Sequence, residues 1–209
     1  MPTIPPQTLG RRERRSRETR EKIFRAALRL FAEQGFFETT TEQITEAADV
    51  GQGTFFNYFP TKQHVLAVLS EIQLRTVRGA RAQVASKDIS TKDLLHSLMQ
   101  DLAKEPGRSQ ALTRALFSAF FSNEAVRTLI GETLTEGRKE LTAILLAGQR
   151  RGEIRMDQKA ADLALAFQRG LAGTLLLWAM QSRSSLKSWL EKAFHDFWAG
   201  AVATKGPVR

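Results

Sequence analysis

The order of apolar and polar residues along the chain predicts helices from end to end. Apolar side chains recur three or four positions apart, and the alternation typical of strands is nowhere sustained. The first such stripe consists of Ile23, Ala27, Leu30 and Phe31, and Gly35 follows as a helix-ending residue. We therefore expect an all-α protein of about nine helices. Their approximate ranges are 15–34, 41–48, 52–59, 61–84, 90–105, 109–121, 124–151, 157–180 and 184–203.

A tight turn joins the second and third predicted helices. Residues 39–43 read TTTEQ, so that Glu42 follows Thr39, and Gln43 follows Thr40, at a distance of three positions. This is the spacing of a capping box. The inner face of the second helix is Ile44, Ala47 and Ala48, whose small side chains let another helix cross closely. Residues 49–51 supply the turn. This order of elements predicts a helix-turn-helix.

The third predicted helix has one apolar and one polar face. Val50, Phe55 and Phe59 would anchor it to the core, and Pro60 ends it. The opposite face carries only amide, hydroxyl and bare backbone groups, from Gln52, Gly53, Thr54 and Asn57. Such groups can donate to and accept from base edges in the DNA major groove. The sequence therefore predicts a DNA-reading helix.

Positive charge is concentrated directly before this motif. The chain of 209 residues has 31 Lys and Arg against 22 Asp and Glu, a formal net charge of +9. The basic residues among positions 10–25 are Arg11, Arg12, Arg14, Arg15, Arg17, Arg20, Lys22 and Arg25. Beside a helix that reads bases, we interpret this segment as an arm that contacts phosphates. The alternative is a solvated helix start without a partner.

From about residue 16 to residue 66 the chain resembles the TetR-type (TetR/AcrR) transcriptional regulators. The resemblance lies in the order of parts: Gly35-Phe36 closes the first helix, Thr39-Thr40 opens the second, and VGQGTFFNYF at residues 50–59 is similar to the recognition segment of the family. Pro60-Thr61-Lys62 follows in register. The chain departs from the family pattern at Gly51, where Ser is usual, and at Phe56, where Tyr is usual.

The resemblance implies a role for individual residues and for the whole chain. Gln52, Gly53, Thr54 and Asn57 would face bases, and Arg17, Thr40, Thr41, Tyr58 and Lys62 would lie at the DNA backbone. It also implies a larger helical domain that binds a small effector. The expected divisions are a disordered basic arm at 1–14, a DNA-binding domain at 15–60, a ligand-binding and dimerisation domain at 61–203 and a disordered tail at 204–209.

The last two predicted helices are the expected dimer surface. A short helix-turn-helix reads one half-site, so specific binding normally needs a symmetric partner. Small residues on the eighth helix permit close contact between helices, and two hairpins would form a four-helix bundle. The alternative is that these residues are buried inside one subunit. The expected interface residues are Leu163, Ala166, Phe167, Gly170, Leu171, Gly173, Leu177, Leu186, Trp189, Leu190, Phe194 and Phe197.

The middle helices carry soft and aromatic side chains of the kind that line cavities for apolar ligands. Ordinary core packing is the alternative for each of them. The candidate pocket residues are His96, Met99, Phe117, Phe120, Phe121 and Trp178.

Other classes of protein are less consistent with the sequence. The three histidines, His64, His96 and His195, have no metal-ligand spacing, and no nucleotide-binding or nucleophile motif is present. We therefore expect no enzyme, no metal and no cofactor. The chain has no cysteine, its start lacks the apolar core of a signal peptide, and its longest apolar stretch, 170–180, is too short to span a bilayer. A cytoplasmic protein without a membrane partner is expected.

These expectations combine into a ligand-responsive transcriptional repressor. A homodimer would bind a palindromic DNA operator and release it when a small, largely apolar effector enters the larger domain. The long fourth helix, from Thr61, would connect the two sites. Two alternatives stay open: an architectural or nonspecific nucleic-acid-binding protein, which the basic arm alone would permit, and an enzyme whose site is built from distant helices.

Overall fold

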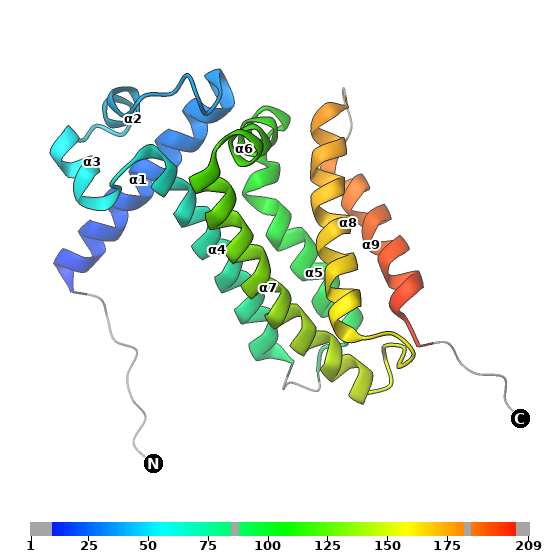
Figure 1. Cartoon of the computed structure of the whole chain (residues 1–209). Coiled ribbons are helices and arrows are strands. Elements are labelled where there is room, and N and C mark those ends of the chain that lie inside the picture. The colour runs from blue at the N-terminus through cyan, green and yellow to red at the C-terminus, as the bar shows by residue number, and fades with distance from the viewer. Residues whose placement is uncertain (1–9, 85–87, 182–184, 204–209) are drawn as a thin grey trace, which may run out of the picture.

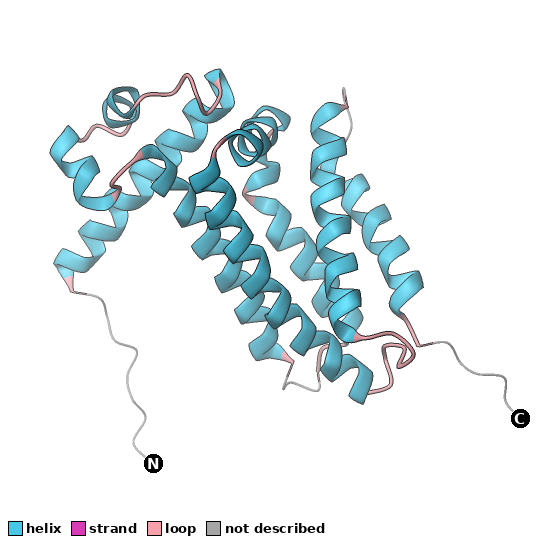
Figure 2. Cartoon of the chain, viewed as in Figure 1, coloured by secondary structure: helices cyan, strands magenta, loops and turns pink. Residues whose placement is uncertain are grey.

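The computed structural model describes residues 10–84, 88–181 and 185–203, and within them the protein is helical (Figures 1 and 2). The elements are α1 (Arg11–Gln34), α2 (Thr41–Ala47), α3 (Gln52–Tyr58), α4 (Lys62–Gln83), α5 (Thr91–Lys104), the 3-10 helix η1 (Pro106–Arg108), α6 (Gln110–Ser122), α7 (Glu124–Arg150), α8 (Ala160–Met180) and α9 (Leu186–Ala201). An isolated bridge joins Ile154 to Val202. The predicted fold class is confirmed.

Most helices begin where their capping residues predict. The side chains of Ser90, Ser109 and Asn123 accept hydrogen bonds from the backbone N–H groups three residues later, at the starts of α5, α6 and α7. At α2 the capping box is formed by Thr40 and Gln43, whose side chains each bond to the backbone N–H of the other residue. These local bonds explain why the boundaries could be predicted.

Two predicted boundaries are wrong. The first helix starts at Arg11, not at residue 15, because the Glu13 carboxylate accepts a hydrogen bond of 3.1 Å from the backbone N–H of Gly10 and stabilises the first turn. Residues 11–14 are therefore helical instead of part of a disordered arm, and residues 1–9 and 204–209 lie outside the described residues. Asp157 does not cap α8, because its carboxylate pairs with Arg155, Nε to Oδ1 at 2.6 Å, and the helix begins at Ala160.

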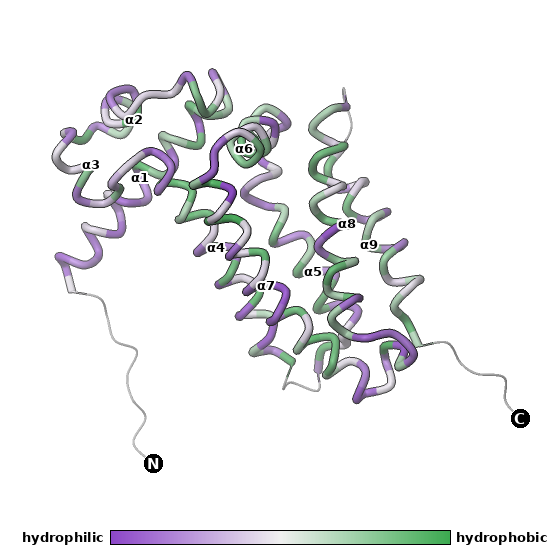
Figure 3. The backbone as a smooth tube through the Cα atoms, in the orientation of Figure 1, coloured by the Kyte–Doolittle hydropathy of each residue, from purple (hydrophilic) through white to green (hydrophobic). Residues whose placement is uncertain are grey.

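The helices enclose two apolar cores. The first joins α1, α2 and α3 to the first half of α4, to α6 and to the start of α7. The second lies among α4, α5, α7, α8 and α9. In Figure 1 the short helices α2 and α3 lie beside α1 at one end of the molecule, and the longer helices form a bundle that extends away from them. Figure 3 shows the first turns of α1 as hydrophilic, in agreement with their exposure.

The packing does not divide at residue 60, where the sequence predicts a domain boundary. Val65 and Leu66 of α4, Leu112 of α6 and Val126 of α7 belong to the same buried cluster as Phe31 of α1. The predicted boundary therefore does not coincide with a break in the core. Movement of α4 or α6 must be felt by the DNA-binding domain, since closely packed interiors transmit strain.

The inner face of α2 differs in one residue from its prediction. Ile44 and Ala48 are buried as expected, but Ala47 is exposed. Thr45 is buried in its place, and its hydroxyl donates to the carbonyl oxygen of Glu42 at 2.8 Å. A hydroxyl satisfied within its own helix can be buried at little cost, so a polar residue occupies an inward position here.

The helix α8 is long and apolar enough to cross a membrane by length and composition alone. Core helices of globular proteins pass the same test. Here α8 lies between α6, α7 and α9, and it contributes Ala164 and Phe167 to the second core. Packing within the bundle therefore accounts for part of its apolar composition, because 39% of its most apolar window is buried.

Candidate DNA-binding surface and ligand cavity

The recognition helix α3 is anchored by aromatic side chains and presents a polar outer face. Phe55 and Phe59 are buried, with 0% and 1% of their surface exposed, and their rings lie 5.7 Å apart. Gln52 and Asn57 are exposed on the other side. A Cβ atom added at Gly53 would meet no other atom of the chain within 4 Å, so packing inside the protein does not require glycine there. These positions are free to approach an external partner.

The candidate phosphate contacts surround this face. Thr40 is exposed at the start of α2, and Thr41 is half-buried beside it. The hydroxyl of Tyr58, at the end of α3, donates to Ser16 Oγ of α1 at 3.2 Å, which fixes the recognition helix against the first helix. Arg17 is exposed on α1. Thr40 and Thr41 thus lie at the start of α2, which packs against α3, and Tyr58 connects α3 to α1.

Lys62 has a structural role in addition to its predicted one. Its ammonium group donates to the carbonyl oxygens of Phe36, Phe37 and Thr39 at 2.7–2.9 Å, and it lies 5.0 Å from the centre of the Phe36 ring. Burial lowers the pKa of Lys62, and the nearby charge of Glu38 partly offsets this effect. Because an ammonium has three N–H donors, this conformation uses all of them on the loop between α1 and α2.

A cavity of about 250 Å³ lies among α4, α6, α7 and α8. Its lining is mainly apolar and includes Leu66 and Leu69 of α4 and Phe117 and Phe120 of α6. None of the described residues that line it is charged. The two phenylalanines are where the sequence predicts pocket residues.

The other four predicted pocket residues do not line this cavity. His96 lies on the opposite side of α5, with Nε2 2.8 Å from a carboxylate oxygen of Glu191 on α9. Met99 and Trp178 are packed in the interior away from the cavity, and Phe121 is 60% exposed. Helical periodicity indicates that a residue faces inward, but it does not distinguish a cavity wall from a filled core.

The sequence analysis missed the polar residues of the lining. Ser70 and Gln73 of α4, Thr133 of α7 and Gln168 of α8 all line the cavity. Ser70 lies four residues from Leu66 and from Leu74, and so it is in the middle of the apolar stripe of its helix. A polar side chain within a core stripe is the signal that could have identified this site.

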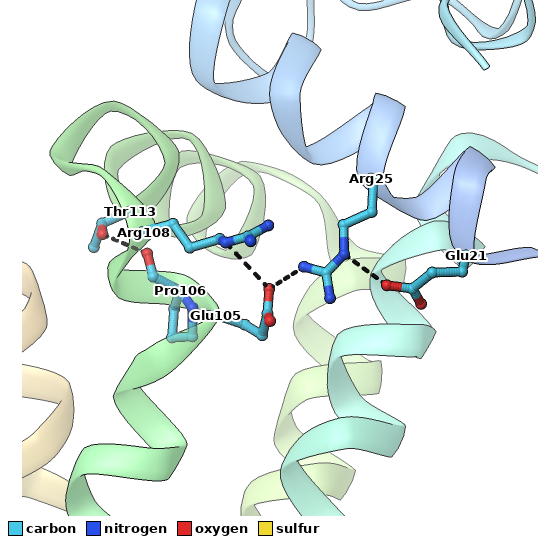
Figure 4. Close-up of polar contacts among 6 residues, drawn as sticks. All are labelled: Glu21, Arg25, Glu105, Pro106, Arg108 and Thr113. Carbon is cyan, nitrogen blue, oxygen red and sulfur yellow. Dashed lines mark hydrogen bonds and ion pairs between the residues drawn. The ribbon is translucent and has the colours of Figure 1, made fainter.

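Charged residues connect the DNA-binding domain to the rim of the cavity (Figure 4). We call Glu21, Arg25, Glu105 and Arg108 the Glu105 cluster. Arg25 of α1 bonds to Glu21 through Nε at 2.6 Å and to Glu105 through Nη1. Arg108 Nε lies 3.8 Å from the same Glu105 oxygen. The hydrogen bond to Glu105 is the largest of the influences that raise the pKa of Arg25.

The Glu105 cluster adjoins the cavity, because residues next to Glu105 in the sequence line the cavity wall. Pro106, the next residue, lines the cavity, and so does Leu102 one turn earlier. The carbonyl of Pro106 accepts a hydrogen bond of 2.7 Å from Thr113 of α6, and the carbonyl of Leu102 accepts one of 2.9 Å from Gln73 of α4. Displacement of the cavity wall at η1 would therefore move the partner of Arg25.

The helices α8 and α9 form an open groove whose lining includes Gly170, Gly173, Leu177, Trp189 and Phe197. Neither glycine has another atom within 4 Å of an added Cβ. Leu177 is 52% exposed. Among the described residues no further helix covers this groove, whose lining also includes the charged side chains of Arg155, Arg169 and Asp196.

Part of the predicted interface lies inside the subunit instead. Leu163, Phe167, Leu190 and Phe194 are buried in the second core, and of these Leu163 also lines the open groove. Leu171 and Leu186 also pack partly against that core. The physical reason is that α6 and α7 cover one side of α8, and α5 covers one side of α9, so one subunit has enough helices to bury one face of the hairpin.

Residues 23–69 match the family model for bacterial regulatory proteins of the tetR family. The chain is 47% identical over 60 residues to the HTH-type transcriptional regulator TcmR of Streptomyces glaucescens, covering 29% of this chain and 26% of that protein. It is 28% identical over 137 residues to the HTH-type transcriptional repressor KstR of Rhodococcus jostii, covering 63% and 65%. The matches therefore span less than two thirds of the length of either relative.

Solved structures extend the similarity to the whole fold. The FadR repressor of Thermus thermophilus in complex with lauroyl-CoA has a TM-score of 0.62 at 27% identity, covering 91% of this chain and 98% of that one. The fatty acid degradation regulator FadR of Bacillus halodurans has a TM-score of 0.74 at 22% identity, covering 93% and 98%. The second likeness concerns the fold alone.

The structural role of Lys62 gives a first testable prediction. Lys62→Ala removes three hydrogen bonds to loop carbonyls, and because the side chain is partly solvated we expect a loss of about 1 to 2 kcal/mol in the free energy of unfolding. This corresponds to a fall of roughly 2 to 8 °C in Tm. The matched control is Lys92→Ala, which removes an exposed lysine of α5. Equal Tm values for the two variants in thermal circular dichroism would contradict the assignment.

Proposed function

We propose that this chain, whose N-terminal domain belongs to the TetR family of bacterial regulatory proteins, is a ligand-responsive transcriptional repressor. It binds a palindromic operator as a homodimer and releases it when an apolar effector fills the cavity. The observation that carries this proposal is α3, in which exposed Gln52, Gly53 and Asn57 stand opposite buried Phe55 and Phe59. Such a regulator acts in the cytoplasm, with the chromosome that it binds.

In this proposal, the residues around α3 divide by the part of DNA that they contact. Gln52, Gly53, Thr54 and Asn57 face the bases, and Arg17, Thr40, Thr41 and Tyr58 lie at the phosphates. Lys62 reaches a phosphate only if it gives up its bonds to the loop carbonyls. A nonspecific nucleic-acid binder would not need the capped and anchored helix or the cavity, so sequence-specific binding is the better account.

Homodimerisation supplies the second half-site. The open groove of α8 and α9 supports a two-fold contact in which Gly170 and Gly173 of one subunit approach the same helices of the partner. Leu177 and Trp189 lie at the same groove and would add apolar area to the contact. The proposed interface therefore consists of the uncovered face of the hairpin, without its buried face.

The effector signal reaches the DNA-binding domain by two routes. Leu66 and Leu69 of α4 line the cavity, and the same helix continues from the recognition segment. The Glu105 cluster adds a second connection, from the η1 wall of the cavity to α1. A ligand shifts the balance between DNA-binding and released states only if it prefers the helix positions of one of them.

The base-reading assignment is tested by Asn57→Ala. We select a duplex from a random pool with the intact protein and measure binding to this duplex and to a scrambled one. The variant should lose about 1 to 3 kcal/mol of its preference for the selected duplex, because one base contact is removed. As a control, Arg17→Ala should weaken binding to both duplexes alike and lower the salt slope by about 1. Equal weakening of binding to both duplexes by Asn57→Ala would show that Asn57 does not read bases.

The dimer assignment is tested by Gly170→Leu. The larger side chain should separate the paired α8 helices at a cost of roughly 1 to 3 kcal/mol per contact, while helicity is kept. We expect the variant to dissociate at higher protein concentration than the parent and to lose operator affinity. Gly79→Leu, on an exposed and open position of α4, is the matched control. A Gly170→Leu protein that stays dimeric in sedimentation at all concentrations would place the interface elsewhere.

The role of the Glu105 cluster is tested by Glu105→Gln, which keeps the shape of the side chain and removes its charge. Operator affinity is measured with and without 1-octanol, an uncharged probe matched to the uncharged lining of the cavity. We expect the effect of the probe on operator affinity to shrink by about 1 kcal/mol, roughly five-fold. Glu140→Gln is the control, because Glu140 pairs with Arg78 and Arg81 between α7 and α4, away from α1. An unchanged probe effect in Glu105→Gln would show that α4 alone transmits the signal.

A further inference from the structure

The polar groups of the cavity lining indicate the chemical class of its ligand. We propose that the effector is an uncharged alcohol: an aliphatic or alicyclic skeleton with one hydroxyl group, which Ser70 and Gln73 of α4 bind. This inference rests on the proposed function, because it names the ligand class of the cavity through which the repressor is regulated. It is argued from the charge of the lining, from two unsatisfied polar groups and from the cavity volume.

The lining excludes a charged group inside the cavity. The described residues that form it are apolar except for Ser70, Gln73, Thr133 and Gln168, and none of these carries a charge. Transfer of a carboxylate or a phosphate from water to such surroundings is strongly unfavourable unless a cation pairs with it. The ligand portion that enters the cavity is therefore neutral.

Ser70 is a buried hydroxyl without a partner. Only 8% of its surface is exposed, and no hydrogen bond joins its side chain to any described residue. Other hydroxyl groups on these helices behave differently: Thr76 of α4 and Thr133 of α7 each donate to the carbonyl four residues earlier at 2.9 Å. An unsatisfied buried hydroxyl costs about 1 to 3 kcal/mol, so a ligand that satisfies it recovers this free energy.

Gln73 supplies an acceptor on the same face of α4, because it lies three residues after Ser70. Its Nε2 donates to the carbonyl oxygen of Leu102 at 2.9 Å, which fixes the orientation of the amide. The amide oxygen Oε1 has no donor among the described residues. Gln168 on α8 is held in the same way, with Nε2 2.8 Å from the carbonyl oxygen of Leu134.

These groups favour a hydroxyl over other neutral polar groups. A ligand hydroxyl accepts from Ser70 and donates to the oxygen of Gln73, so both groups are satisfied. A ketone accepts only from Ser70 and leaves the Gln73 oxygen without a donor. A hydrocarbon satisfies neither. The expected order of affinity for one carbon skeleton is therefore alcohol, then ketone, then hydrocarbon.

The volume sets the size of the skeleton. At roughly 30 Å³ for each water-sized group, a cavity of 250 Å³ holds about eight such groups. Compounds with eight carbon atoms are therefore suitable probes. Lauroyl-CoA, the ligand in the Thermus thermophilus FadR complex, carries phosphates that no charged side chain of this lining could pair, and so acyl-CoA is an opposing outcome of the test.

The experiment uses the full chain and five probes: 1-octanol, 2-octanone, octane, octanoate and octanoyl-CoA. Each is titrated into the protein, and dissociation constants are obtained by isothermal titration calorimetry. We expect 1-octanol to bind about ten-fold more tightly than octane, because two neutral hydrogen bonds are gained. Tighter binding of octanoate or octanoyl-CoA than of 1-octanol would overturn the proposed ligand class.

A matched pair of variants tests the assignment to Ser70. Ser70→Ala should lower the affinity for 1-octanol about ten-fold and leave the affinity for octane unchanged or improved. Thr133→Val removes a hydroxyl that also lines the cavity but is already satisfied by the main chain, so it should preserve the preference for the alcohol. Equal loss of affinity for both probes in Ser70→Ala would show that the serine shapes the cavity without binding the hydroxyl.

Failure of this inference is distinguishable from failure of the proposed function. The titration contains no DNA and measures ligand binding alone, and the Ser70→Ala variant assigns that binding to the cavity. A protein that prefers the alcohol but does not select a DNA sequence would contradict the repressor and keep the ligand class. A protein that selects a sequence but prefers octanoate would keep the repressor and contradict the ligand class.

Discussion

The packing of α1 against α6 and the first half of α4 is the interaction on which the rest of the structure depends. Phe24 and Phe31 of α1 share one buried cluster with Leu66 of α4 and with Leu112 and Ala119 of α6. Since α4 and α6 also form walls of the ligand cavity, no independent layer separates the cavity from the DNA-binding domain. A helix displaced on the cavity side must either carry α1 with it or open a void in this core, and voids are costly.

The DNA-binding half could be predicted in detail because its signals are local. The capping box of Thr40 and Gln43 and the anchors Phe55 and Phe59 act within a few residues of one another, so their spacing in the sequence is their spacing in space. The errors there have local causes that spacing does not reveal. Ala47 is exposed because Thr45, satisfied by its own helix, takes the inward position.

The larger helical part of the chain, from α4 onward, could be predicted only as a set of helices. A cavity is defined by what fails to fill the space between helices that are distant in sequence, and helical periodicity contains no such information. Met99 and Phe117 have the same inward phase on their helices, yet one is packed in the core and the other lines the cavity. Likewise, Phe167 and Gly170 lie one turn apart on α8, but neighbouring helices cover only the first.

The cavity and its unsatisfied hydroxyl both lower the stability of the unliganded protein, and both are costs that a ligand removes. The apolar body of an alcohol recovers the contacts missing from the cavity walls, which any hydrocarbon of that size would also provide. The hydroxyl would recover the bonds missing at Ser70 and Gln73, which both lie on α4, whereas the rest of the cavity wall includes residues of α7 and α8. In the proposed complex, apolar contact and the two hydrogen bonds of the hydroxyl would both contribute to affinity, and the hydrogen bonds would place the ligand against α4. Because α4 leads directly into the recognition segment, the same two side chains would select the ligand and bias the state of the DNA-binding domain.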